Sequence, residues 1–139
     1  MKEDKRSYPR AKIKWPVVVE SDKGKMEGVT SNLTPDGLFI HCESPLRLNA
    51  AIQLTIDIPN SKQTLTAKAE VIWSNRYGPN DEISPRGMGV RFISISSEAR
   101  KFIAQAALNY FKSKELAPEL LQTLKTLVID TNETKMRAA

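Results

Sequence analysis

The feature that most constrains the fold is a series of short segments in which apolar and polar residues alternate. Residues 52–58 are the clearest case, because isoleucine or leucine occupies every second position there. A period of two puts alternate side chains on opposite faces of a β-strand, so that one face can be buried while the other meets water. Comparable patterns occur in five further segments, namely 13–19, 25–31, 38–42, 65–73 and 89–94. We therefore expect six short strands.

Turn-forming residues separate these segments. Gly24, within Ser21–Lys25, can adopt the positive φ that a hairpin turn requires. Pro45 and Pro59 interrupt the pattern at two further points, and residues 75–87 form a loop rich in turn formers. Short strands with closely spaced turns favour a small antiparallel barrel or sandwich.

After the last strand the apolar residues change to helical spacing, at positions 99, 102, 103, 106 and 110. Ser96 or Ser97 can cap this helix, Glu98 suits its first turn, and Lys112 suits its end. Because helices are predicted only at the end of the chain, no βαβ unit is implied, which argues against a doubly wound nucleotide-binding fold.

A second apolar run at helical spacing covers residues 120–128. It either packs back on the strands or mediates self-association or docking of a partner. Residues 130–139 have no such pattern and are expected to be a frayed tail.

Composition indicates one ordinary globular domain, since 40% of the 139 residues are apolar and 27% are charged. No stretch approaches the roughly 18 consecutive apolar residues of a transmembrane helix. The first residues contain no apolar core of a secretory signal. Cys42 is the single cysteine and cannot form an internal disulfide. We therefore expect a cytoplasmic protein without membrane insertion.

The positive charge is concentrated at one end of the chain. Residues 1–14 hold six lysines and arginines against two acidic residues, a net of +4 out of the total of +5. A general nucleic-acid binder usually carries a broad basic face. A localised cluster suits a compact anion better than a long polyanion.

No catalytic constellation is evident. His41 is the only histidine and lies in a predicted strand. A lone histidine in a strand is usually at the surface, or its ring nitrogens have hydrogen-bond partners within the protein. Cys42 has the spacing of a small core residue, and His41 would lie on the opposite face of the same strand. Paired carboxylates, zinc spacing and Gly-rich phosphate motifs are missing from the sequence. We predict a protein that is not an enzyme and holds no metal or cofactor.

The first candidate for ligand binding is the basic segment with Lys5, Arg6 and Arg10. Arginine makes bidentate contacts to phosphate, and it can also stack on a purine or bond to its N7/O6 edge. Pro9 disfavours helix at the residue before it, so an extended or turning segment that wraps its ligand is expected. The alternative is a solvated basic tail.

The second candidate is the segment Asn32–Gly37, with the sequence NLTPDG. Asn32 and Thr34 would point the same way on an extended segment and could bond to the edge of a guanine. Gly37 would allow close approach of a ligand or of another backbone. The alternative is a well-formed β-turn, because Asn and Thr side chains bond to turn backbone and PDG is a turn signal.

In this order and at this separation the two segments resemble the motifs of the PilZ domain family, RxxxR followed by [DN]xSxxG. Arg6–Arg10 matches the first and Asn32–Gly37 the second. The stretches "AEVIWS" (69–74) and "RGMGVRFISIS" (86–96) are also similar to family strands, so the resemblance covers about residues 4–112. It implies a six-stranded antiparallel barrel with a C-terminal α-helix, here followed by a second short helix. It also implies binding of the bacterial second messenger cyclic di-GMP.

The resemblance assigns a role to each motif residue. Arg6 and Arg10 would hold the phosphates and a guanine of cyclic di-GMP. Asn32 and Thr34 would bond to guanine edges, and Gly37 would make the turn.

Three positions qualify this assignment. Lys5 matches a flanking ligand-binding position that is often arginine, and lysine keeps the charge but loses the planar fork. Thr34 stands where serine is usual, and it keeps the hydroxyl. Trp73 matches an aromatic that could flank the site, although a core position on its strand would fit equally well.

The resulting prediction is a flexible basic ligand-binding arm (1–11), a PilZ-like barrel with its helix (12–116) and a short helical extension with a tail (117–139). Ordering of the arm on cyclic di-GMP would signal to a protein partner in motility, biofilm or envelope processes, with a homodimer left open. The alternative is a PilZ-like adaptor for protein–protein interaction with weak or no nucleotide binding. A barrel that binds nucleic acid is disfavoured, because the nine aromatic residues form no evident stacking strand.

Overall fold

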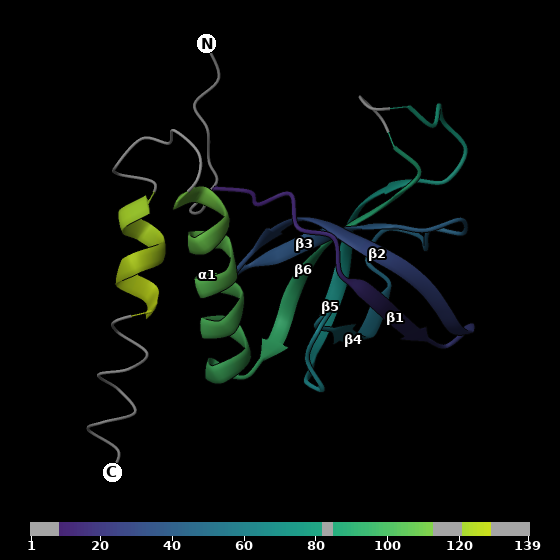
Figure 1. Cartoon of the computed structure of the whole chain (residues 1–139). Helices are drawn as coiled ribbons and strands as arrows, with labels where there is room; N and C mark the ends of the chain where they lie inside the picture. Colours follow the sequence, from purple (N-terminus) through teal and green to yellow (C-terminus); the bar gives the residue numbers. More distant parts are fainter. Residues whose placement is uncertain (1–8, 82–84, 113–120, 129–139) are drawn as a thin grey trace.

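The computed structural model describes residues 9–81, 85–112 and 121–128. Within these ranges six antiparallel strands form a closed barrel in the order β1-β2-β3-β6-β5-β4 (Figure 1). The strands are β1 (Pro16–Ser21), β2 (Gly24–Thr34), β3 (Gly37–His41), β4 (Ala51–Asp57), β5 (Thr64–Asn75) and β6 (Gly87–Ile95). Helix α1 (Ser97–Lys112) follows, and residues 121–128 form a second helix. The predicted fold class is confirmed.

The inward faces of the strands fill the barrel with apolar side chains. Alternate residues are buried along β1, β3, β4 and the first part of β5, as the period-two pattern predicted. The innermost residues include Val17, Val19, Ile40, Leu54, Ile56 and Val71. Burial of this apolar surface is the main driving force for closing the barrel. Helix α1 packs onto the same core, where the ring of Phe102 lies 6.1 Å from that of Trp15.

Thr30 determines where β1 begins. Its side chain is fully buried, and its hydroxyl accepts a hydrogen bond from the Trp15 amide and donates one to the Ile13 carbonyl, both at 2.9 Å. The Thr30 amide donates to the Trp15 carbonyl at 2.9 Å. Residues 13–15 are therefore fastened to β2 partly by a side chain, and regular pairing with β2 starts only at Pro16, later than the alternation predicted.

Ser96 is the N-cap of α1. Its hydroxyl accepts the Ala99 amide at 3.0 Å, and its carbonyl accepts the Arg100 amide at 2.9 Å. Glu98 lies in the first turn and Lys112 in the last, where each charge is favourable to the helix dipole. Of the two capping serines that the sequence offered, the first is the one used.

The second helix, residues 121–128, packs on the rest of the molecule. Leu124 is fully buried in the same core as the barrel residues, and Leu121, Leu127 and Val128 are partly buried against it. Figure 1 draws this helix beside α1. Of the two interpretations of this apolar run, packing back on the fold agrees with the described residues. The division of the chain at residues 11 and 116 stays a prediction.

Candidate functional site

The segment after the basic motif is paired with β2. Two backbone hydrogen bonds join Ala11 and Leu33, at 3.0 Å from the Ala11 amide and 2.7 Å from the Leu33 amide. Both side chains are fully buried. Arg10 is exposed and lies one residue before this pair, while Asn32 and Thr34 flank it on β2. The end of the first motif and the start of the second are thus neighbours. Lys5 and Arg6 lie outside the described residues.

Asn32 has a backbone conformation that few residues adopt. Its φ is 49°, in the left-handed region where Asn is better tolerated than most other non-glycine residues. The pairing of β2 with β3 shifts register between Ser31 and Thr34, so Asn32 lies in an irregular part of the ladder. Its half-buried side chain is consequently aimed differently from that of a regular strand residue.

The Thr34 hydroxyl is used within the turn that joins β2 and β3. It accepts the amides of Asp36 and Gly37, and it also lies 3.1 Å from the Gly37 carbonyl, to which it can donate. These bonds form the β-turn that was the alternative interpretation of this segment. Thr34 therefore shapes the motif, and any ligand contact to its hydroxyl would share an oxygen that already serves the turn.

Gly37 allows β3 to lie close to β6. A Cβ atom at this position would come within 2.2 Å of the Val90 carbonyl oxygen and 3.0 Å of the Arg91 Cα. The sequence allowed close approach of either a ligand or another backbone at Gly37. In the structure, the backbone of β6 makes this approach.

A row of register partners crosses the outer face of the barrel beside this turn. Ser31 of β2 pairs with Phe39 of β3, Phe39 with Gly89 of β6, and Gly89 with Trp73 of β5. The rings of Phe39 and Trp73 lie 5.6 Å apart. Trp73 is 44% exposed, so it belongs to the outer face and not to the core. The row places two aromatic rings on an accessible surface next to Gly37.

Glycines in β6 leave room for these rings. A Cβ atom on Gly87 would come within 2.7 Å of the Phe39 ring, so this ring packs against the backbone of β6. His41, which pairs with Gly87, meets the Phe39 ring edge-on with the centroids 4.9 Å apart. The Phe39 ring is inclined at 67° to the His41 ring and at 49° to the Trp73 ring, so the three form a tilted aromatic cluster and not a flat surface. An accessible aromatic ring such as that of Trp73 suits stacking of a purine.

Three neighbours of the motif were missed by the sequence analysis. Ser31 and Phe39 face outward beside Asn32, and Arg91 lies opposite Gly37 and forms a 3.3 Å ion pair with Glu70. The signal for Phe39 was present, since it alternates with the buried Leu38 and Ile40. Arg91 could not be identified from the sequence, because only the pairing of β3 with β6 places it opposite Gly37.

Burial shifts the pKa of both His41 and Cys42. Burial, and to a smaller extent the positive charge of Lys14, lowers the pKa of His41 below its usual value. Burial raises the pKa of Cys42 to about 11, so the thiolate that a nucleophile requires is disfavoured. Cys42 is buried in the core, as its spacing predicted.

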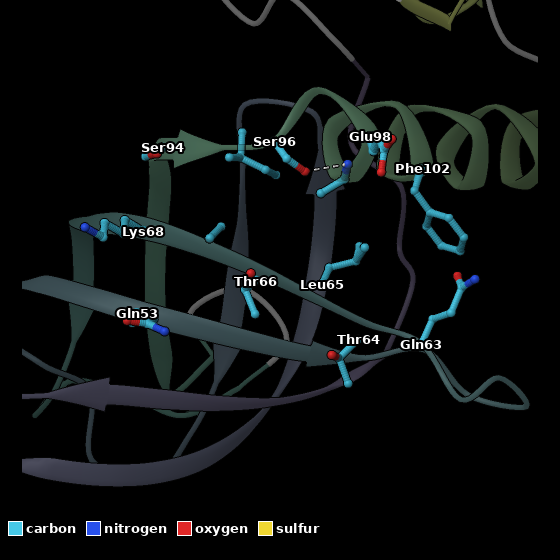
Figure 2. Close-up of a pocket in the computed structure, with 13 residues that line it drawn as sticks. Gln53, Gln63, Thr64, Leu65, Thr66, Lys68, Ser94, Ser96, Glu98 and Phe102 are labelled. Atoms are coloured by element: carbon cyan, nitrogen blue, oxygen red, sulfur yellow. Dashed lines mark hydrogen bonds between the residues drawn. The ribbon is translucent and has the colours of Figure 1, made fainter.

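The described part of the chain has two open cavities that lie away from the Asn32–Gly37 turn. One, of about 680 Å³, lies between the start of α1 and strands β4, β5 and β6; its lining includes Thr66, Lys68, Ser94 and Phe102 (Figure 2). The other, of about 710 Å³, is lined by His41, Glu43 and Arg86, among others. Neither has Arg10, Asn32, Thr34, Gly37 or Trp73 in its lining.

Two features are missing from residues 9–81, 85–112 and 121–128. These ranges contain no group of three His, Cys, Asp or Glu side chains that could hold a metal ion. Nor do they contain a helix that is long and apolar enough to cross a membrane.

Solved structures with a similar fold include two that share little sequence identity with this chain. The Bacillus subtilis inhibitor of motility (MotI/DgrA) has a TM-score of 0.67 at 15% identity over 83% of this chain, which spans 55% of that protein. The PilZ domain of YcgR from Escherichia coli, solved with c-di-GMP, has a TM-score of 0.61 at 11% identity. That match covers 79% of this chain and 94% of the YcgR domain.

Comparison at the level of sequence gives the family. No curated protein matches the sequence significantly. The family model for the PilZ domain matches residues 4–108, a stretch that contains both motifs, all six strands of the barrel and most of α1. The chain belongs to the PilZ domain family.

Proposed function

We propose that this protein is a non-catalytic cytoplasmic receptor for cyclic di-GMP, which binds on the outer face of the barrel between the N-terminal arm and the Asn32–Gly37 turn. The observation that carries the proposal is the pairing of Ala11 with Leu33, because it makes neighbours of two motifs that are far apart in the sequence. The YcgR domain with a similar fold was solved with this ligand, which supports the proposal.

The arm supplies positive charge for the two phosphates of the ligand. Arg6 and Arg10 each offer a planar fork that matches a phosphate or the N7/O6 edge of guanine. Lys5 adds a point charge without the fork. Because Arg10 is exposed and anchored one residue from a buried pair, its side chain can reach the outer face at a small cost in chain entropy.

The barrel supplies the surface for the guanines. Asn32 presents an amide that can both donate and accept hydrogen bonds at a guanine edge. The neighbouring rings of Phe39 and Trp73 offer a stacking surface on the same side, and Gly37 and Thr34 hold the turn that positions Asn32. Base–aromatic stacking contributes about 1–3 kcal/mol per base.

Signalling would follow from the arm. If the segment with Lys5 and Arg6 becomes ordered only over the ligand, binding changes the surface that a partner protein meets. Motility, biofilm formation or envelope assembly are the processes we propose for such an output. This chain spans only 55% of the motility inhibitor with a similar fold, so that protein does not identify the partner here.

Calorimetric titration with cyclic di-GMP tests the proposal. Replacing Arg6 or Arg10 by alanine removes a charge-assisted contact of about 1.5–3 kcal/mol, so affinity should fall about tenfold or more. Lys23→Ala is the matched control, because it also removes one positive charge but lies in the turn between β1 and β2, at the other end of β2. We expect the control to bind like the wild type.

Two results would count against this function. If the wild-type protein gives no heat of binding at micromolar concentrations, the receptor function is wrong. The alternative, a PilZ-like adaptor for protein–protein interaction, would then be favoured. Equal loss of affinity in Lys23→Ala and Arg10→Ala would mean that net charge, and not the arm, attracts the ligand.

A further inference from the structure

The turn between β2 and β3 is held from outside by two other elements. The Asp36 carbonyl accepts the amide of Phe92 in β6 at 2.8 Å. From the first turn of α1, Arg100 places Nη2 3.0 Å from the Asp36 carboxylate and Nε 3.4 Å from the Pro35 carbonyl. One guanidinium therefore contacts two successive residues of the motif, at a sequence separation of about 64 residues.

This contact is expected to contribute little to the unfolding free energy of the protein. The side chains of Arg100 and Asp36 are 35% and 56% exposed, and ion pairs at such exposure usually contribute little because solvent screens them. Its consequence is local. The fork fixes the orientation of Pro35 and Asp36, which lie between Thr34 and Gly37 and so set the shape of the turn.

The ion pair also has an electrostatic consequence for an anionic ligand. Asp36 puts a negative charge inside the segment proposed to meet cyclic di-GMP, whose two phosphates are negative. An unpaired carboxylate there would repel the ligand over several ångströms. Arg100 lies against that carboxylate and offsets its charge.

We propose that Arg100 is a positioning residue for the cyclic di-GMP site, and that its contacts with Pro35 and Asp36 couple occupancy of the site to the first turn of α1. This inference rests on the proposed function. Coupling of this kind is reciprocal: if Arg100 favours binding, the bound ligand favours the Arg100 contact. The start of α1, including the Ser96 cap, would then be more protected in the bound state.

The test is a titration of the full chain with cyclic di-GMP, comparing Arg100→Ala, Arg100→Lys and the double variant Arg100→Ala/Asp36→Asn. Arg100→Ala should bind about tenfold more weakly, the equivalent of one charge-assisted hydrogen bond. Arg100→Lys keeps the positive charge but loses the planar guanidinium. Its affinity for cyclic di-GMP should therefore lie between those of the wild type and of Arg100→Ala. The double variant should bind more tightly than Arg100→Ala, because the unpaired carboxylate is gone.

Lys112→Ala is the control, since it removes one positive charge from an exposed position in the last turn of the same helix. It should bind like the wild type. Wild-type affinity in Arg100→Ala would overturn the inference and leave the proposed function standing. A wild-type chain that binds no cyclic di-GMP would overturn both.

A second measurement needs no ligand. The Gly37 amide is bonded to the Thr34 hydroxyl inside the turn, so its hydrogen exchange reports whether the turn is held closed. Exchange at Asp36 and Gly37 should be faster in Arg100→Ala than in the wild type, with exchange in β4 unchanged. Unchanged exchange at both amides would show that Arg100 does not position the turn, whatever its effect on affinity.

Discussion

At the scale of single residues, Gly37 connects the motif to the barrel. It is the last residue of the NLTPDG segment and the first residue of β3, and its missing side chain lets the Val90 carbonyl approach. A glycine that belongs to the proposed ligand-binding motif is thus also required by the packing of two strands. Loss of binding on mutation of Gly37 would therefore include a contribution from loss of fold.

Gly37→Ala should destabilise the protein by about 1–3 kcal/mol or more, the usual range for an overpacked site. Gly89→Ala is the matched comparison in the same region, because its Cβ would meet only Trp73, at an ordinary contact distance of 3.5 Å. Urea unfolding monitored by circular dichroism measures the difference in unfolding free energy. Equal stabilities of the two variants would contradict the close approach of β3 and β6.

Trp73 was a candidate from sequence, but its position on the outer face could not be predicted from the alternation. Strict alternation from Leu65 to Trp73 puts both residues on one face, and Val71 is indeed buried. A register shift between Val71 and Trp73 inserts Ile72 as an extra residue and moves Trp73 to the outer face. Nothing local in the sequence marks this bulge. The turn that contains Thr34 and Gly37 could be predicted, because its residue types are typical of turns.

At the scale of elements, the helix of residues 121–128 extends the fold beyond the region matched by the family model. Its helical spacing could be predicted, but its location could not, since an apolar stripe fits a core and an interface equally well. Leu124 decides the point, because its side chain is fully buried with the barrel core.

Leu124→Ala should therefore lower the unfolding free energy by about 2–5 kcal/mol, the usual cost of truncating a buried leucine. Gln122→Ala, at an exposed position of the same helix, should change it little. Thermal and urea unfolding of both variants provide the measurement. A Leu124→Ala protein as stable as the wild type would show instead that this leucine serves an interface and not the core.

At the scale of the whole molecule, six alternating segments and a terminal helix were enough to predict a small β-fold. The closure of the barrel was not contained in that pattern. It depends on two long-range pairings, β1 with β4 and β3 with β6, which link strands that are not consecutive in the chain. The second of these also builds the candidate site, because it brings Gly89 and Arg91 beside Phe39 and Gly37.

The proposed site lies on the outer face of a packed barrel, not in its interior or in either cavity. Arg10, the Asn32–Gly37 turn and the Phe39–Trp73 pair come from the arm, from the β2–β3 junction and from β3 and β5. A flat, anionic, two-purine ligand suits such an open arrangement better than a small molecule that needs enclosure. The central claim is therefore about location as well as ligand identity.

The most direct test is to map the binding surface by nuclear magnetic resonance, titrating isotope-labelled protein with cyclic di-GMP. We expect the largest shift changes at the backbone amides of Arg10, Asn32, Gly37 and Phe39 and at the Trp73 indole. The buried Trp15 indole, which is 8% exposed, should change little and serves as an internal reference. Changes confined to the groove between α1 and residues 64–68, or no changes at saturating ligand, would contradict the account.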